Sequence, residues 1–150
     1  MGSSPLQPTI MEGAYDMQTL TNANTTMSIN VVNRFNGIHC WPDAPEPVGF
    51  LRNHHHHLFV VYTQIDVNHD DRELEFLMVQ RDIDKYIHQT MMVTGNTAFL
   101  GDMSCEQIAK RIIKFVGDKY GSNRSISVGV FEDDENGCWV TYAGDADGTV

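Results

Sequence analysis

Four consecutive histidines, His54 to His57, lie a third of the way along the 150-residue chain. They are followed at once by the segment Leu58 to Ile65, which is rich in aromatic and β-branched residues and predicts a buried strand. A purification tag would stand at a terminus, so we interpret these histidines as part of the fold. The strand that they open is the feature that most constrains what the chain can fold into.

Side chains alternate between the two faces of a strand, so histidines two residues apart point to the same side and can bind one ion together. The run offers two such pairs, His54 with His56 and His55 with His57. The second pair shares its face with the side chains at 59, 61, 63 and 65, which form the more uniformly apolar pattern. We therefore prefer His55 and His57 as the ligand pair, with the other pair as the alternative.

A second strand is predicted before the histidines and a connecting loop between the two. Apolar and polar residues alternate from Thr26 to about Trp41, and this strand carries His39. Three prolines in the segment 42–47 lack backbone donors, which excludes a helix or a central strand and indicates an extended loop.

The second half of the chain predicts two helices and two further strands. Apolar residues recur at helical spacing from about Val79 to Met91. Residues 92–103 are small and typical of turns, and Ser104 with Gln107 then forms a capping box for a helix that stops near Gly117 or Gly121. Strands follow at 126–131 and 138–142, with an Asn-Gly hairpin signal in the turn 133–137 between them.

This order, ββααββ, predicts an α+β domain with a four-stranded antiparallel sheet and two helices on one face. We place the domain at residues 26–144. Residues 1–25 are rich in Gly, Ser, Pro, Thr and Asn without periodicity and are expected to form a disordered tail, as are residues 145–150.

The composition limits which binding partners and which cellular compartment are expected for the protein. The formal charge of −10 repels phosphate backbones, which argues against binding to nucleic acid or to anionic membranes. No apolar run reaches the ~20 residues of a spanning helix and no secretory pattern opens the chain, so a cytoplasmic protein is expected. The three cysteines, Cys40, Cys105 and Cys138, lack a metal-binding spacing and are expected to be free thiols.

Several motifs together resemble the 6-pyruvoyl-tetrahydropterin synthase and 6-carboxy-tetrahydropterin synthase family. They occur in the family's order over about residues 27–143: Phe35-Asn36-Gly37-Ile38-His39, a His-x-His at a strand start, Ser104-Cys105-Glu106 at a helix start, and Val130-Phe131-Glu132. The resemblance implies the tunnelling fold, in which subunits join their sheets into a barrel. It therefore also implies a homo-oligomer, trimer-based or as large as a hexamer, with active sites between neighbouring subunits.

The resemblance also implies a site. His39, His55 and His57 would bind Zn²⁺, Glu132 would hold the pterin ring, and Ser104, Cys105 and Glu106 would lie near the substrate. Three neutral imidazoles with one open position describe a catalytic zinc centre. A carboxylate such as Glu132 can accept two parallel N–H bonds from an aminopyrimidinone edge, which pterins share with guanine.

The chain departs from the family pattern in its acid-base residues. The family has a cysteine about four residues before the His-x-His, where this chain has Phe50 to Asn53, and the family's Leu-Asp-His motif is missing. By residue type alone, Cys40, Asp43 and His88 are candidates for the catalytic base. On a regular strand, Cys40 is expected to face away from His39.

The main hypothesis is a zinc-dependent enzyme of pterin metabolism, a lyase acting on a dihydroneopterin triphosphate-like substrate. The alternative is a divergent family member that binds a pterin, purine or nucleotide-like ligand without the usual turnover. A cupin-type metal protein would need a glutamate four or five residues after the second histidine, where this chain has Val61 and Tyr62.

Overall fold

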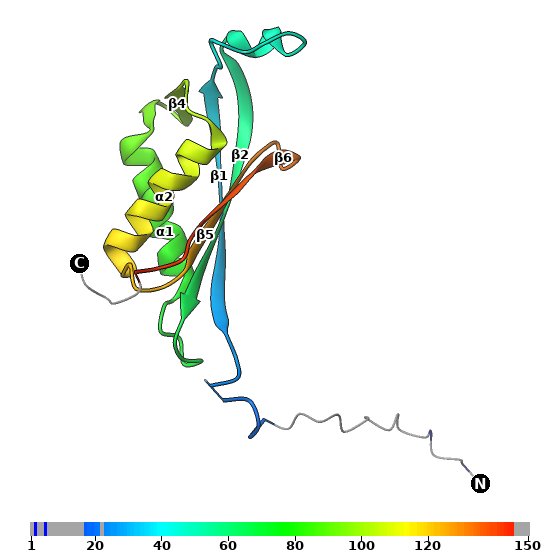
Figure 1. Ribbon diagram of the computed structural model, residues 1–150, viewed down its shortest axis with the longest axis vertical. Helices are drawn as coiled ribbons and strands as arrows, with labels where there is room; N and C mark the ends of the chain where they lie inside the picture. Colours follow the sequence, from blue (N-terminus) through cyan, green and yellow to red (C-terminus); the bar gives the residue numbers. More distant parts are fainter. Residues whose placement is uncertain (1, 3–4, 6–16, 22, 146–150) are drawn as a thin grey trace.

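The computed structural model describes residues 2, 5, 17–21 and 23–145, without the side chains of residues 92–94 (Figure 1). Most of the predicted N-terminal tail and nearly all of the predicted C-terminal tail lie outside these residues. The described part consists of one sheet with two helices packed against it.

The sheet has six strands in the order β3-β4-β1-β2-β5-β6. The strands are β1 (Met27–His39), β2 (His55–Val67), β3 (Met92–Thr94), β4 (Thr97–Gly101), β5 (Ile126–Glu132) and β6 (Asn136–Tyr142). The pairing of β1 with β4 is parallel and all the other pairings are antiparallel, so the sheet is mixed. The four strands predicted from the sequence are its long central and C-terminal members.

The prediction of a purely antiparallel four-stranded sheet is therefore wrong in one region. Residues 92–103, predicted as turns, contain the short hairpin of β3 and β4, which adds two strands beside the end of β1. These strands have only three and five residues and are separated by a turn in which Gly95 has φ of 60°. Alternation over so few residues does not distinguish a strand from a loop.

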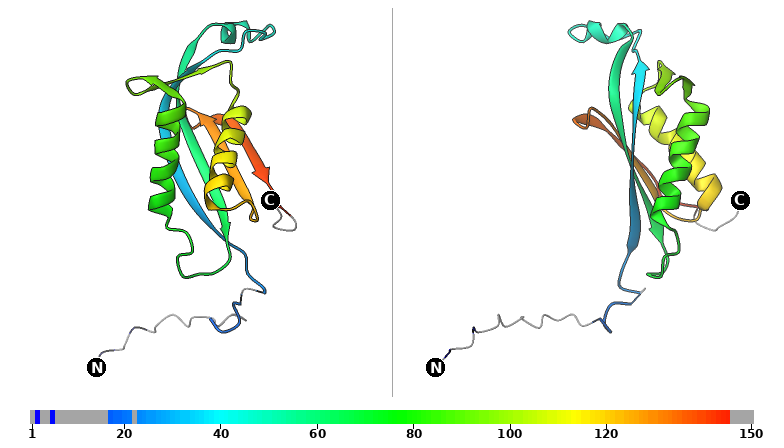
Figure 2. Two further views of the ribbon diagram at one scale, coloured as in Figure 1. Left: turned by 90° about the vertical axis from the view of Figure 1, so that its left-hand side faces the viewer. Right: turned by 180° about the vertical axis from the view of Figure 1, so that it is seen from behind.

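Both helices cover the same face of the sheet, as predicted (Figure 2). They are α1 (Phe76–Thr90) and α2 (Cys105–Tyr120), and a short 3₁₀ helix, η1 (Gly49–Arg52), lies between β1 and β2. Each helix buries one apolar stripe against the sheet: Val79, Ile83 and Ile87 of α1, and Ile108, Ile112 and Val116 of α2. Among the described residues, no helix has the length and apolar character needed to span a membrane.

The termini of α2 follow the sequence signals. Ser104 accepts from the backbone of Gln107, whose side chain bonds back to the backbone of Ser104, so the predicted capping box is present. The helix passes Gly117 and ends before Gly121, which has φ of 105°. The capping box thereby sets where α2 begins.

The turn between β5 and β6 lies within the predicted segment 133–137 and is shorter than predicted, since β6 begins at Asn136 and not at Cys138. Positive φ values of 54° and 56° occur at Asp133 and Asp134, and Gly137 already pairs with Phe131 inside the ladder. Aspartate tolerates the left-handed region because its short polar side chain bonds locally. The Asn-Gly signal therefore lies in the first residues of β6, and the turn directs Asp133 toward β2.

The register between β1 and β2 determines which side chains meet where β1 ends and β2 begins. All 13 residues of β1 pair with β2, and the last pairs are Gly37 with His57 and His39 with His55. Gly37 is in tight contact with its neighbours, since a Cβ atom there would lie 2.7 Å from the Phe59 ring and 2.9 Å from Leu100. The Phe59 ring in turn lies against His39, with ring centroids 5.3 Å apart.

We expect Gly37→Ala to lower the free energy of unfolding by about 1–3 kcal/mol, because the added methyl overpacks the buried Phe59 ring. Gly117→Ala is the matched control, since its Cβ would meet Ile126 at an ordinary 3.7 Å. That helical substitution should raise stability by up to about 1 kcal/mol. Urea unfolding of both variants measures the difference, and effects of the same sign would contradict this account of Gly37.

Candidate metal centre and adjoining cavity

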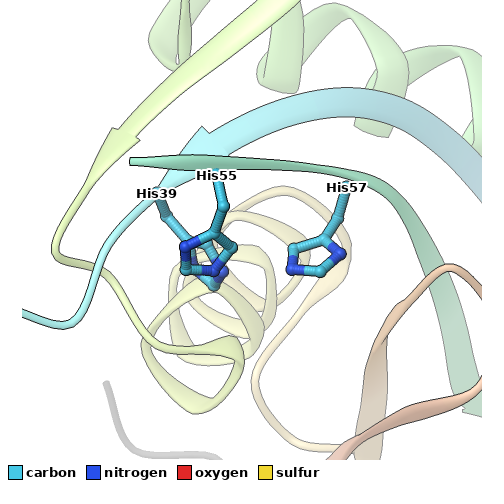
Figure 3. Close-up of side chains that lie close together, drawn as sticks. All are labelled: His39, His55 and His57. Carbon is cyan, nitrogen blue, oxygen red and sulfur yellow. The ribbon is translucent and has the colours of Figure 1, made fainter. Parts of the chain in front are cut away.

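Three imidazoles meet where β1 ends and β2 begins (Figure 3). His39 and His55 are direct cross-strand partners, and His57 lies two residues further along the same face of β2. One nitrogen from each ring lies within 4.8 Å of the others. The structure thus brings together His39, His55 and His57, whereas His56 is exposed on the opposite face.

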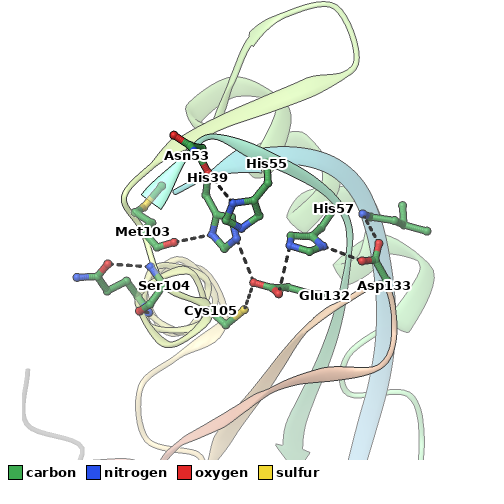
Figure 4. A network of polar contacts seen from close by, with 11 residues as sticks. His39, Asn53, His55, His57, Met103, Ser104, Cys105, Glu132 and Asp133 are labelled. Carbon is green, nitrogen blue, oxygen red and sulfur yellow. Dashed lines mark hydrogen bonds and ion pairs between the residues drawn. The ribbon is translucent and has the colours of Figure 1, made fainter. Parts of the chain in front are cut away.

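The outer nitrogen of each ring is held by a hydrogen-bond acceptor (Figure 4). The Nδ1 atoms lie 3.0 Å from the carbonyl of Met103 for His39, 2.8 Å from the carbonyl of Asn53 for His55, and 2.6 Å from the carboxylate of Asp133 for His57. Carbonyl and carboxylate oxygens only accept, so each Nδ1 must carry the proton and donate it. A neutral ring then leaves a lone pair on Nε2, the form that binds metal.

Glu132, the last residue of β5, faces two of these Nε2 atoms. Its Oε1 lies 3.1 Å from Nε2 of His39, and its Oε2 lies 3.3 Å from Nε2 of His57. The carboxylate raises the pKa of His39, and His39 in turn holds the pKa of Glu132 below its ordinary value. Both Nε2 atoms are buried and have no hydrogen-bond partner of acceptable geometry among the described residues.

These contacts suit a cation. An anionic oxygen beside two nitrogen lone pairs is repulsive unless a positive charge lies between them, either a proton or a metal ion. Three imidazoles with ordered outer hydrogen bonds are a donor set that suits Zn²⁺. The residues present therefore fit the metal that the sequence predicted, and the ion would lie at the wall of a cavity.

The cavity has a volume of about 600 Å³ and opens beside the metal centre. It is lined by the ends of β1 and β2, the first turn of α2 and the start of β6: His39, Cys40, Trp41, Leu51, His55, Asp102, Met103, Ser104, Cys105, Glu106, Gln107, Glu132, Asn136 and Gly137. All four residues expected near the substrate, Ser104, Cys105, Glu106 and Glu132, are in this lining.

Polar groups at the first turn of α2 differ in their freedom to bind a ligand. The Ser104 hydroxyl already accepts from Gln107. The Cys105 thiol donates to Oε1 of Glu132 at 3.8 Å, and burial raises its pKa to about 12, so it stays a neutral donor. Glu106 is exposed and makes no hydrogen bond or ion pair with any other described side chain, so its carboxylate is free to bind a ligand.

Cys40 is among the residues that line the cavity, as His39 is. It follows β1 directly, because that strand ends at His39. The backbone N–H of Cys40 donates to Gly101 of β4, and its Sγ lies 3.8 Å from Nε2 of His54.

The other two candidate bases lie elsewhere. Asp43 is an exposed residue of the proline-rich loop and is not part of the cavity lining. His88 lies on α1, where its Nδ1 bonds the carbonyl of Asp84 at 2.8 Å. Neither residue is brought to the metal centre.

Sequence reasoning missed the residues that orient the imidazoles. Asp133 belongs to an acidic turn, and its nearness to Glu132 was the one signal that could have suggested a role. Met103 and Asn53 act through backbone carbonyls, which any residue provides, so their identities carry no signal.

We expect Asp133→Asn to weaken Zn²⁺ binding by about 10–100-fold, because one amide oxygen cannot serve both His57 and the backbone of Leu58. Asparagine keeps the left-handed backbone that this position needs. Asp134→Asn is the matched control: the same turn, a similar φ, and a contact only with the Tyr62 hydroxyl. Competition with a chromogenic chelator measures both affinities, and equal losses in the two variants would contradict the role of Asp133.

No protein-family model and no curated protein matches the sequence. Solved structures do match. The 6-pyruvoyl tetrahydropterin synthase of Plasmodium falciparum is 15% identical with a TM-score of 0.57, over 79% of this chain and 98% of that one. The synthase of Caenorhabditis elegans is 13% identical with a TM-score of 0.56, over 81% and 97%.

A third match is the synthase of Plasmodium vivax in which a catalytic glutamate is replaced by alanine. It is 14% identical with a TM-score of 0.56, over 79% of this chain and 98% of that one. At such low identity the likeness concerns the fold. The chain therefore has the fold of the 6-pyruvoyl tetrahydropterin synthases over about four fifths of its length.

Proposed function

We propose that the protein is a zinc-dependent enzyme of pterin metabolism that acts on a dihydroneopterin triphosphate-like substrate. The observation that carries the proposal is the convergence of the imidazoles of His39, His55 and His57 beside a cavity of about 600 Å³, whose lining includes His39 and His55. A cavity of this size matches a small heterocyclic ligand. The shared fold with 6-pyruvoyl tetrahydropterin synthases supports a ligand of the pterin class.

The histidines would hold Zn²⁺, which supplies a Lewis acid that polarises a carbonyl or hydroxyl of the substrate and so eases proton removal. The aminopyrimidinone edge of a pterin presents N–H groups that suit a carboxylate. The cavity lining contains two glutamates that could fill this role, Glu132 and Glu106.

Proton transfer needs a further group. Of the three candidates from the sequence, only Cys40 lines the cavity, directly after the ligand His39. A glutamate is a catalytic residue in the Plasmodium vivax synthase. The assignment of Cys40 as base stays a prediction, as does the cytoplasmic location.

Product analysis with 7,8-dihydroneopterin triphosphate tests the proposal. Zinc-loaded protein is expected to convert this substrate, and His55→Ala/His57→Ala should lower the rate by about a thousandfold or more, because the metal contributes several kcal/mol of charge stabilisation.

The matched control is His56→Ala/His69→Ala, which removes two exposed histidines outside the site and should leave the rate unchanged. Unchanged substrate with the zinc-loaded wild type would exclude this reaction. Binding of the pterin without conversion would favour the alternative, a protein that holds the ligand without turning it over.

We further propose that the chain forms a trimer-based homo-oligomer with sites completed by neighbouring subunits. Support comes from the sheet face opposite the helices, which no described element covers (Figure 2). This face carries a cluster of Tyr62, Phe131 and Trp139, with ring centroids 5.8–6.2 Å apart, and Trp139 is 54% exposed. The strand β6 is also an open edge of the sheet.

Light scattering is expected to give three or six times the chain mass of 16.9 kDa. Trp139→Glu should shift the mass toward a single chain, because it places a charge in the exposed aromatic cluster. Met78→Glu, on the solvent side of α1 and 63% exposed, should not. A monomeric wild type would contradict the assembly.

A further inference from the structure

A second, smaller pocket adjoins the cavity beside the three histidines. Its volume is about 370 Å³, and it is lined by Asp102, Met103, Gln107, Lys110 and Arg111. The first three of these residues also line the larger cavity, so the two spaces are neighbours. A ligand in the larger cavity therefore has a second space beside it.

The start of α2 determines where the two basic residues of this second pocket lie. The capping box makes Gln107 the third residue of the helix. Lys110 and Arg111 follow it by three and four residues, and this spacing places them on the same side of the helix, one turn further along. Both are exposed. The helix thus presents two cations on the side of Gln107, which lines both spaces.

Neither of these cations is neutralised by the described part of the chain. The side chains of Lys110 and Arg111 form no ion pair or hydrogen bond with another described residue. The other two lysines of α2, Lys114 and Lys119, each bond an aspartate, at 2.7 Å and 3.3 Å. In a chain with a formal charge of −10, two unpaired cations in one pocket are a local exception that suits an anion.

From this arrangement we propose that the second pocket binds the phosphate groups of the ligand whose ring occupies the larger cavity, with Lys110 and Arg111 in contact with the phosphates. The inference rests on the proposed function and assigns the part of the substrate that this pocket takes, a polyphosphate chain such as a triphosphate.

The charges of the two spaces match the two ends of such a substrate. The larger cavity is lined by three carboxylates, those of Asp102, Glu106 and Glu132. Their charge exceeds that of one bound Zn²⁺, so this cavity suits the N–H groups of a ring and repels a triphosphate. The second pocket sets Lys110 and Arg111 against the single carboxylate of Asp102. A ligand with a ring and a polyphosphate is therefore oriented with its phosphates toward α2.

The side chains of this pocket offer complementary donors to phosphate. The guanidinium of Arg111 can donate parallel N–H bonds to two oxygens, and the ammonium of Lys110 adds a compact positive charge. Gln107 adds a neutral donor: its Oε1 accepts from the backbone of Ser104, and its Nε2 has no partner among the described residues. Together they provide the kind of contacts that a polyphosphate needs.

Binding of inorganic tripolyphosphate, measured by calorimetry at a fixed low ionic strength, tests the assignment. We expect Lys110→Gln/Arg111→Gln to weaken binding by about tenfold or more, because charge-assisted hydrogen bonds are lost. Arg81→Gln/Lys85→Gln is the matched control, since it removes the same two kinds of charge from exposed positions of α1 outside both spaces. The control should bind tripolyphosphate as the wild type does. A wild type that binds none, or equal losses in the two variants, would overturn the assignment.

Asp102→Asn should have the opposite effect. Its carboxylate is exposed and is the one negative charge in the lining of the second pocket, so its removal should tighten the binding of tripolyphosphate. Unchanged or weaker binding would place the anion elsewhere and would count against the pocket.

A comparison of 7,8-dihydroneopterin triphosphate with 7,8-dihydroneopterin separates this inference from the proposed function. Lys110→Gln/Arg111→Gln should bind the triphosphate more weakly and the unphosphorylated compound as well as wild type does, which also shows that the variant is folded. Equal binding of the triphosphate by wild type and variant would overturn only the phosphate pocket. If the wild type converts no substrate but binds tripolyphosphate through these two residues, the proposed reaction fails and the phosphate pocket stands.

Discussion

The cluster of His39, His55 and His57 depends on one register, the antiparallel pairing of β1 with β2. That register sets His39 opposite His55 and Gly37 opposite His57, and it directs all three imidazoles to the face that the helices cover. A shift by one residue would turn the histidines to the other face and expose the apolar side chains that follow them. The buried residues Phe59, Val61 and Ile65 therefore fix the positions of the three histidines by fixing the strand.

A second layer of contacts comes from elements that are distant in sequence. The carbonyl that holds His39 belongs to Met103, just before α2, and the carboxylate that holds His57 follows β5. The β3–β4 hairpin contributes as well, because β4 pairs with the end of β1 and leads directly into the α2 cap. The added strands thus have a function: they carry Met103 to the imidazole of His39.

Long periodic signals predicted the main elements, and local or backbone-mediated features escaped prediction. Side-chain types alone define the alternation in β1 and β2 and the capping box of Ser104 and Gln107. Both features could therefore be predicted from the sequence. The strands β3 and β4 are too short for a pattern. The predicted turn 133–137 is shorter than expected, because Asp133 and Asp134 adopt positive φ and Asn136 and Gly137 already pair with β5.

The separation of the site's parts along the chain has a consequence for protein synthesis. The partners of His39 and His57 lie 64 and 76 residues further on. On the ribosome, the histidine run therefore emerges long before the groups that select its tautomers and bring Glu132 alongside. For that interval, the adjacent imidazoles lack the acceptors that order them in the folded chain. The order of the histidine cluster is thus complete only when β5 and the turn after it join the sheet.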